Sequence, residues 1–305
     1  MNNLITDIKS LELETIKNLR NSKSVNTLRA YQSDYNDFSL FCSKNGFQAM
    51  PTQPKILALY LTHLSSYSKY STLKRRLASI SILNKIKGHY IDTKHPIIME
   101  NLMGIKRTNG SNQKGKKPLL ISDLKVLIQA IHQSKEKDLR KTRDKALVLI
   151  GFSGGFRRSE LVDIEYEDIE FVNEGVKIFV KRSKTDQSGE GMTKAIPYFD
   201  NKDFCPVKSL KNWIEVLGLK KGKIFNISDK SVALIIKKYA NYAGLEGHKY
   251  AGHSLRSGFA TSTAESGAEE RNIMAMTGHK STEMVRRYIK DANLFKNNAL
   301  NKIKI

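Results

Sequence analysis

Apolar residues recur every three or four positions through the first third of the chain, which is the period of one face of an α-helix. In residues 24–46 the positions that share such a face are Leu28, Tyr31, Tyr35, Phe38 and Cys42. The same period predicts helices over residues 55–67, 71–87 and 96–106, and a weaker helix or arm over residues 1–23. In residues 55–67 the side chains expected to point inward are Ile56, Leu59, Tyr60 and Leu64. Because no alternating strand pattern interrupts the series, we expect residues 1–108 to form an all-helical domain.

Residues 109–118 separate this domain from the rest of the chain. The segment contains only Asn, Gly, Ser, Gln, Lys and Pro, and such residues bury too little apolar surface to order themselves. We interpret the segment as an interdomain linker, long enough to pass around a duplex. Residues 119–305 then form a second domain.

The second domain is predicted to combine helices with a short run of strands. Ser122 is expected to cap its first helix, and the nearly all-apolar residues 146–152 are expected to form a buried helix. Strand-like segments follow over residues 165–171, 176–181 and 192–198, and the last two are expected to form a hairpin. A last helix is predicted over residues 291–305, with Asp291 as its cap. The predicted fold class is therefore mainly α, with a small antiparallel β-sheet in the C-terminal domain.

Composition excludes several classes of protein. No apolar run approaches the roughly 20 residues of a membrane-spanning helix, and residues 1–7 lack the basic and apolar regions of a secretion signal. The two cysteines, Cys42 and Cys205, belong to apolar helical patterns and are expected to be reduced core residues. No Cys and His cluster has the spacing of a metal site, so neither a metal nor another cofactor is predicted. These features favour a cytoplasmic protein without a membrane partner.

Charge points to a polyanionic partner. The chain has 52 Lys and Arg against 30 Asp and Glu, a formal net charge of +22, and an excess of this size favours nucleic acid through release of counterions. A lysine-rich solvated surface is the alternative, but such surfaces usually carry comparable Glu. The side chains predicted to contact DNA are Arg29, Lys69, Lys74, Arg75, Arg76, Lys116, Lys117 and Arg182. For the cluster at residues 74–76, a solvated helix face without a partner is the alternative interpretation.

Reactive side chains are concentrated in the C-terminal part of the chain. His253 and Arg256 are three residues apart, so on a helix they lie on one face and can reach one anion together. His279 follows a glycine at a predicted junction between helices, and Tyr288 comes nine residues later. The two imidazoles and the guanidinium are suited to binding a phosphate group, and the phenol is suited to attacking it.

A second arginine precedes this region. Gly154 and Gly155 permit a tight turn, after which Arg157 would project from the start of a helix, where the helix dipole favours an anion. The alternative is a surface arginine that pairs with Glu160 at the i, i+3 spacing and adds only tenths of a kcal/mol. The predicted hairpin that follows is basic and carries Lys181, Arg182, Lys184 and Lys194. Such a hairpin can enter a DNA groove and deliver a proton from a lysine.

Taken together, these motifs resemble those of the tyrosine recombinase family, which includes phage integrases, Cre and Xer-type recombinases. The resemblance rests on Gly-Phe-Arg-Arg-Ser-Glu-Leu, a basic hairpin with Lys-Thr, His-Ser-Leu-Arg, Gly-His, and a tyrosine nine residues on. It covers nearly the whole chain and implies a two-domain, C-shaped DNA clamp. Residues 1–108 would be the core-binding domain and residues 119–305 the catalytic domain.

The resemblance also implies a role for each site residue. The catalytic residues that it assigns are Arg157, Lys184, His253, Arg256, His279 and Tyr288, and Glu160 would support Arg157. Arg157 is chosen over its neighbour Arg158 because of the Arg-x-Ser-Glu-Leu spacing. Tyr288 would attack a phosphodiester and form a 3′-phosphotyrosine, Lys184 would protonate the leaving 5′ oxygen, and neither metal nor ATP would be needed.

By the same resemblance the protein would be a site-specific recombinase or integrase of bacterial or phage origin, associated with the nucleoid when bound. It would act on double-stranded DNA as a homo-tetramer on two sites, with residues 291–305 docking on a neighbouring protomer and accessory DNA-bending proteins as further partners. Two other interpretations are a type IB topoisomerase, which uses the same chemistry on one duplex, and a non-catalytic DNA-binding regulator with the same fold. The intact residue set argues against the regulator.

Overall fold

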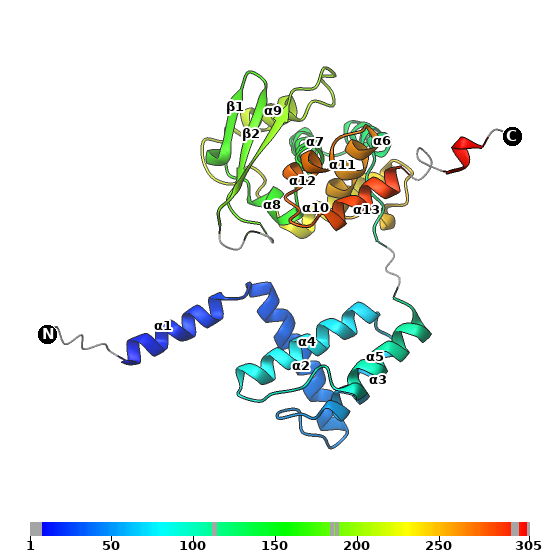
Figure 1. Ribbon diagram of the computed structural model, residues 1–305. Coiled ribbons are helices and arrows are strands. Elements are labelled where there is room, and N and C mark those ends of the chain that lie inside the picture. Colours follow the sequence, from blue (N-terminus) through cyan, green and yellow to red (C-terminus); the bar gives the residue numbers. More distant parts are fainter. Residues whose placement is uncertain (1–7, 112–114, 184–185, 187–188, 294–298, 304–305) are drawn as a thin grey trace. The chain divides into compact units, whose positions relative to one another are not determined.

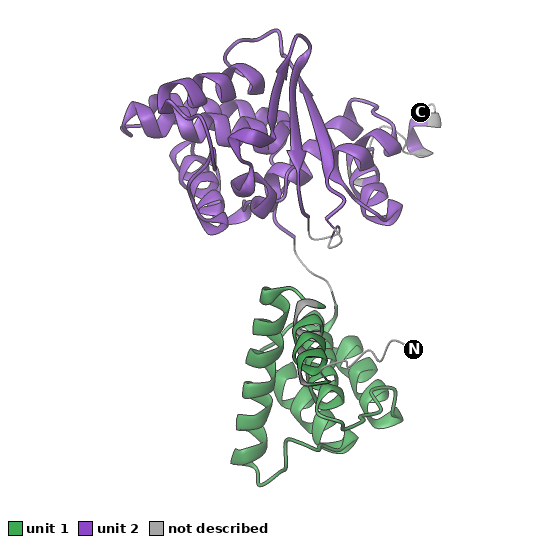
Figure 2. Ribbon diagram, turned by 90° about the vertical axis from the view of Figure 1, so that its left-hand side faces the viewer, with its two compact units in different colours: residues 1–114 green, residues 115–305 purple. Residues whose placement is uncertain are grey.

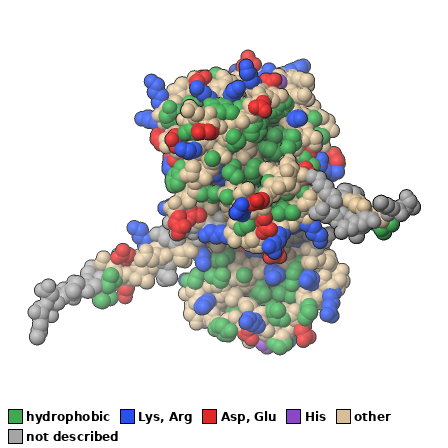
Figure 3. Space-filling view, turned by 45° about the horizontal axis from the view of Figure 1, so that its top comes forward, with side chains coloured by type: hydrophobic (Ala, Val, Ile, Leu, Met, Phe, Trp, Pro, Cys, Tyr) green, Lys and Arg blue, Asp and Glu red, His purple; other side chains and the backbone are tan. Residues whose placement is uncertain are grey.

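The computed structural model describes residues 8–111, 115–183, 186, 189–293 and 299–303 (Figure 1). The chain divides into two compact units, residues 1–114 and 115–305 (Figure 2). This division falls within the segment predicted to be the linker. Residues 1–114 contain 17 Lys and Arg against 7 Asp and Glu, and residues 115–305 contain 35 against 23. Both units are therefore basic, and Lys and Arg side chains are widespread on the face shown in Figure 3.

The first unit is helical, as its apolar period predicts. Its elements are α1 (Ile8–Asn21), α2 (Val25–Lys44), α3 (Pro54–Ser65), α4 (Tyr70–Ile86) and α5 (Pro96–Asn109). Ser24 caps α2, because its hydroxyl accepts a hydrogen bond from the backbone N–H of Thr27 at 3.2 Å. The core contains Phe38, Leu61, Leu73 and Ile98, all without solvent exposure.

One predicted core position of this unit is wrong. Leu59 is 44% exposed, because the buried face of α3 runs through Leu57, Tyr60, Leu61 and Leu64 instead. An apolar residue beside a buried stripe belongs to that stripe only if a neighbouring helix covers it, and sequence spacing does not contain that information.

The second unit contains the remaining helices and one sheet. Its helices are α6 (Ile121–Gln133), α7 (Asp138–Ser153), α8 (Arg158–Asp163), α9 (Pro206–Leu217), α10 (Asp229–Tyr242), α11 (His253–Glu265), α12 (Glu270–Thr277) and α13 (Thr282–Ala292). The antiparallel sheet has the order β1 (Ile169–Val172), β2 (Gly175–Val180) and β3 (Met192–Pro197). Short 3₁₀ turns lie at Tyr166–Asp168, Gly247–Lys249 and Ala299–Lys302. The predicted fold class, mainly α with a small antiparallel sheet, is confirmed. No helix among the residues described here is both long and apolar enough to cross a membrane.

Three local predictions differ from the structure. The first strand begins at Ile169, because residues 166–168 form a 3₁₀ turn in which Glu165 and Asp168 cap each other. Ser122 is not a cap, since α6 already begins at Ile121. Asp291 lies inside α13, so no helix begins there; of the predicted helix over residues 291–305, residues 294–298 and 304–305 lie outside the described part.

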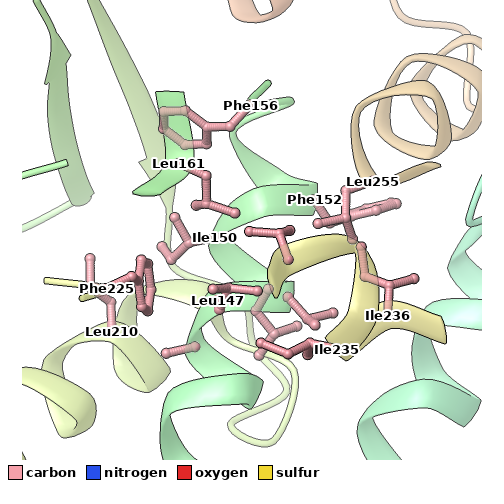
Figure 4. Packing of buried hydrophobic residues seen from close by; sticks show 14 of the residues in the cluster. Leu147, Ile150, Phe152, Phe156, Leu161, Leu210, Phe225, Ile235, Ile236 and Leu255 are labelled. Carbon is pink, nitrogen blue, oxygen red and sulfur yellow. The ribbon is translucent and has the colours of Figure 1, made fainter. Parts of the chain in front are cut away.

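Helix α7 is the centre of the second unit. Its residues 146–150 have no solvent exposure, as expected for a nearly all-apolar helix. Figure 4 shows Leu147 and Ile150 of α7 among side chains from helices far apart in the sequence, including Leu161, Leu210, Ile236 and Leu255. Burying each such side chain contributes about 1.5–3 kcal/mol. The packed core around α7 therefore fixes the positions of the helix ends from which the adjoining loops begin.

Helix α13 is held by a smaller cluster. Ala260 and Ala264 of α11, Ile273 of α12 and Val285 of α13 are buried together, and Tyr288 packs at the edge of the group. The tyrosine thus lies on a helix that packs against α11 and α12.

Candidate active site

Arg157 is fixed between two loops. Gly155 has φ +55°, a left-handed conformation that favours glycine, and Arg157 follows as the residue that caps α8. Its guanidinium donates to Oε1 of Glu160 at 2.5 Å and to the carbonyl of Gly278 at 3.4 Å, and its backbone N–H donates to Oε2 of Glu160 at 2.9 Å. The pairing with Glu160 thus orients Arg157 toward the loop after α12.

Arg158 faces another way. Its guanidinium lies 3.7 Å from Oδ2 of Asp229 on α10, and its aliphatic stem packs beside Gly252. The arginine that lies between Glu160 and Gly278 is therefore Arg157, the one chosen from the Arg-x-Ser-Glu-Leu spacing, and not Arg158.

Arg256 is a deeply buried charged group of this region. It lies in the first turn of α11, is 1% exposed, and donates from one terminal nitrogen to the carbonyl of Gly155 at 2.9 Å. Its other terminal nitrogen is buried and makes no hydrogen bond to any residue that the structure describes. Burial and the nearby charge of Arg157 lower the pKa of Arg256 to about 10, so it remains charged at neutral pH. A buried charged donor without a protein acceptor is suited to an anionic ligand.

His253 and Tyr288 meet near Arg256. Nε2 of His253, the first residue of α11, lies 3.3 Å from the phenolic oxygen of Tyr288 on α13. Desolvation and the charges of Arg256, Arg157 and Arg158 lower the pKa of His253. The imidazole is therefore neutral at physiological pH and can accept the phenolic proton.

His279 forms the remaining side of the group. It follows Gly278, which ends α12 in the left-handed conformation at φ +62°. Nδ1 of His279 lies 2.7 Å from the hydroxyl of Thr277, and its ring centre lies 6.1 Å from that of Tyr288. Burial and the positive charges of Arg256 and Arg157 lower the pKa of His279 to about 4. The Thr277 hydroxyl donates to the carbonyl of Ile273 at 2.6 Å, so it accepts from Nδ1–H of His279, and the neutral ring carries its lone pair on Nε2.

Five of the six predicted catalytic side chains thus belong to one electrostatically coupled group. The charge of Arg256 lowers the pKa of both His253 and His279, and Tyr288 partly opposes the lowering of the pKa of Arg256. The sixth, Lys184, lies outside the described residues. The neighbouring Arg182 is exposed, and Lys181 pairs with Glu165 and with Asp168.

Lys194 was not predicted as a site residue. We expected it on a basic hairpin, but it is 1% exposed and its ammonium donates to the carbonyls of Gly154 and Met276. A signal was present in the strand pattern, since Met192, Lys194 and Ile196 alternate onto the inward face of β3.

The predicted DNA contacts of the first unit differ in their surroundings. Arg29, Lys69 and Lys74 are exposed. Arg75 is half-exposed and pairs with the buried Asp34. Arg76 is only 18% exposed, pairs with Asp37, lies 3.8 Å from Asp34 and donates to the hydroxyl of Tyr60. The surroundings of Arg76 favour a role in the packing of its own domain.

The two candidate lysines at the end of the predicted linker belong to the second unit and pair with other residues of it. Nζ of Lys116 donates to the carbonyl of His248 at 2.7 Å. Nζ of Lys117 lies 2.9 Å from the hydroxyl of Tyr250 and 3.1 Å from Oδ2 of Asp123. Both side chains therefore have protein partners in addition to any DNA phosphate that they contact.

Metal ligands do not gather in the described ranges. No group of three or more His, Cys, Asp or Glu side chains placed to hold a metal ion occurs there. The cations available to an anionic ligand at this site are the guanidinium groups of Arg157 and Arg256.

Comparisons with known proteins agree with this geometry. The sequence profile of the phage integrase family matches residues 121–294. An integrase/recombinase XerD homolog from Selenomonas ruminantium is 41% identical over 314 residues, covering 98% of this chain and 91% of the relative.

Two solved structures share the fold at low sequence identity. The XerH site-specific recombinase in a post-cleavage complex with its palindromic difH substrate has a TM-score of 0.61 at 18% identity, over 81% of this chain and 73% of that one. A lambda integrase tetramer bound to a Holliday junction has a TM-score of 0.59 at 18% identity, over 92% and 75% of the two chains.

Proposed function

The chain belongs to the phage integrase family and is a tyrosine site-specific recombinase, and from that premise we propose that Tyr288 cleaves DNA through a covalent 3′-phosphotyrosine intermediate. The observation that carries the proposal is the convergence of the Tyr288 phenol, the neutral imidazole of His253 and the unsatisfied terminal nitrogen of Arg256. A nucleophile, its base and a charged donor for the phosphate are thereby brought together.

In the proposed step the phenolic oxygen of Tyr288 attacks the phosphorus of a DNA phosphodiester. The bond between phosphorus and the 5′ oxygen breaks while the bond to Tyr288 forms, and the phenolic proton passes to Nε2 of His253. Lys184, by the role that the family resemblance gives it, supplies the proton to the leaving 5′ oxygen. One phosphodiester replaces another of similar energy, so rejoining by a 5′ hydroxyl needs no ATP.

Positive charge stabilises the negative charge that builds up at phosphorus. Arg157 and Arg256 keep their charge at neutral pH and donate to the non-bridging oxygens. His279 adds a hydrogen bond from Nε2 once the negative charge of the bound phosphate has favoured the protonated form of its ring. Glu160 holds Arg157 in place and offsets part of the repulsion between the two guanidinium groups. We propose that this set acts without a metal ion or another cofactor.

The proposed substrate is double-stranded DNA, bound by both basic units. Solved relatives are described as bound to a DNA substrate and, as a tetramer, to a Holliday junction. We propose the same assembly here, a dimer on each of two sites and a tetramer during strand exchange. The segment after α13 would dock on a neighbouring protomer, and accessory DNA-bending proteins would be further partners.

Trapping of covalent complexes tests the proposal and identifies the DNA target in the same experiment. The full-length protein is incubated with a pool of nicked duplexes of random sequence, and DNA that stays attached under denaturing conditions is sequenced. We expect one recurring sequence, joined to the protein through its 3′ phosphate. Efficient relaxation of supercoiled plasmid, with covalent complexes on all sequences alike, would instead indicate a topoisomerase. Absence of any covalent complex would contradict the proposal.

A further inference from the structure

Lys194 is a buried cation that the proposed reaction leaves without a role. It lies on β3 opposite Ile178 of β2, on the sheet face that also carries Ile196. All three side chains are buried, and the strand alternation therefore predicts an apolar residue at position 194. Lysine is almost never fully buried unless its ammonium finds hydrogen-bond partners, because desolvation of the charge is unfavourable.

The partners of Lys194 are two backbone carbonyls and one aromatic ring. Nζ donates to the carbonyl oxygen of Gly154 at 2.7 Å and of Met276 at 2.6 Å, and it lies 4.5 Å from the ring centre of Phe156. Gly154 caps the C-terminus of α7 and Met276 lies in the last turn of α12. Carbonyls at the C-terminal end of a helix lack N–H donors within the helix, so the ammonium satisfies groups that would otherwise be buried unpaired.

These two carbonyls belong to the two loops that carry the phosphate-binding side chains. Gly154 directly precedes Gly155, whose carbonyl accepts from Arg256, and Arg157 follows two residues later. Met276 directly precedes Thr277, whose hydroxyl contacts His279. Lys194 therefore connects two segments. One carries Arg157 and accepts a hydrogen bond from Arg256, and the other carries His279.

We propose that Lys194 is a positioning residue of the cleavage reaction. By binding the carbonyls of Gly154 and Met276 together, its ammonium sets the distance between Arg157 and Arg256 on one side and His279 on the other, so that all three reach one phosphate. This inference rests on the proposed function and assigns to Lys194 no contact with DNA.

The charges that face Lys194 make this connection sensitive to pH. They are the carboxylate of Glu160 on α8, the guanidinium groups of Arg157 and of Arg256 on α11, and the imidazole of His279 after α12. Burial, only partly opposed by Glu160 and reinforced by the two arginines, lowers the pKa of Lys194 to about 7. Above that pH the ammonium of Lys194 loses a proton, and the neutral amine is a weaker donor whose lone pair faces the Phe156 ring. The hydrogen bonds to the carbonyls of Gly154 and Met276 should therefore weaken.

Three variants test the proposal on the duplex recovered by covalent trapping. Lys194→Met removes the donors in a side chain of similar length, and we expect covalent complex formation to slow at least tenfold while the affinity for the duplex changes less than threefold. Lys194→Arg retains donors and charge and should recover most of the rate. Lys177→Met on β2, which removes an exposed lysine paired with Glu170, is the matched control and should stay within twofold of wild type.

The pH profile separates positioning from simple stabilisation of the fold. Arginine does not lose its proton in this range, so the rate of Lys194→Arg relative to wild type should rise between pH 7 and pH 9. Thermal unfolding should show Lys194→Met within about 5 °C of wild type, since loss of a buried charge offsets loss of its hydrogen bonds. A wild-type rate in Lys194→Met, or no recovery in a folded Lys194→Arg, overturns the proposal.

Binding of inorganic phosphate, followed through the His279 ring signals by NMR, tests the inference apart from DNA cleavage. We expect Lys194→Met to weaken phosphate binding at least fivefold and Lys177→Met to leave it unchanged. Equal affinities in wild type and Lys194→Met, or no phosphate binding by wild type, would count against the inference. Failure of wild type to form covalent complexes would count against the proposed function alone.

Discussion

The phenolic oxygen of Tyr288 lies 3.3 Å from Nε2 of His253, although the two residues are 35 positions apart in the sequence. The contact joins α13 to the first turn of α11, and it pairs the proposed nucleophile with a neutral base.

Replacement of Tyr288 by Phe removes the nucleophilic oxygen and keeps the ring that packs at the edge of the α11–α13 cluster. Covalent complex formation should fall by at least about 10⁴-fold, because no other group replaces a missing nucleophile. DNA affinity, measured by gel shift on the trapped duplex, should stay within a few-fold of wild type. Covalent complexes formed by Tyr288→Phe would show that another residue is the nucleophile.

The adjacent arginines provide a matched pair of variants. Arg157→Ala removes a donor held by Glu160 and Gly278 and should lower the cleavage rate by about 10²–10³-fold, the usual loss for one charged donor at a reacting centre. Arg158→Ala removes a long ion pair with Asp229 and should change the rate less than about threefold. Single-turnover cleavage of a nicked duplex measures both, and equal rates would refute the assignment of Arg157.

The rate of cleavage should depend on the protonation of His253. The lowered pKa of His253 means that its neutral, proton-accepting form predominates down to pH values below the ordinary imidazole value of about 6.5. The rate of cleavage by wild type should therefore be constant around neutral pH and fall only as the pH drops below about 6.5. His253→Gln should be slower by about 10²-fold at pH 7.5 and should lack this acidic fall. An identical pH profile in the variant would exclude His253 as the base.

Thr277 should act through the tautomer of His279. Thr277→Val removes the hydroxyl that contacts Nδ1 and should slow cleavage by about tenfold, whereas Thr277→Ser should retain the rate. Thr263→Val is the matched control, because Thr263 makes the same bond to the carbonyl four residues earlier without contacting a histidine. NMR of the histidine rings reports the tautomer directly. A Thr277→Val variant with an unchanged His279 tautomer would refute this role.

Two neighbouring positions of α4 should separate DNA contact from domain stability. Lys74→Met removes an exposed charge and should weaken DNA binding, with a slope of log affinity against log salt that is smaller by about 1. Arg76→Met removes a partner of Asp37 and Tyr60 and should lower the free energy of unfolding by about 1–3 kcal/mol. Chemical denaturation and salt-dependent gel shifts distinguish the two effects. A stability loss in Lys74→Met of the same size would contradict the distinction.

Local patterns in the sequence determined most of the secondary structure and the identity of the reactive groups. The 3.6-residue period predicted the helices of the first unit, and the apolar run at residues 146–152 predicted a buried helix, of which residues 146–150 have no solvent exposure. The spacing between Gly155 and Arg157, and between Gly278 and Tyr288, identified side chains that the fold brings together. Such features depend on near neighbours in the chain, and the sequence contains them directly.

Only the tertiary structure decided which charged side chains face solvent and which are committed to the protein. Lys194, Arg76 and Lys117 resemble ordinary surface cations in the sequence, yet each finds an acceptor far along the chain: Lys194 at Gly154 and Met276, Arg76 at Asp37, Lys117 at the hydroxyl of Tyr250. The exposure of Leu59 has the same origin, since no helix among the described residues covers that side of α3. The free energy of burying a charge depends on the partners that folding brings close to it, and the spacing of residues along the sequence does not identify those partners.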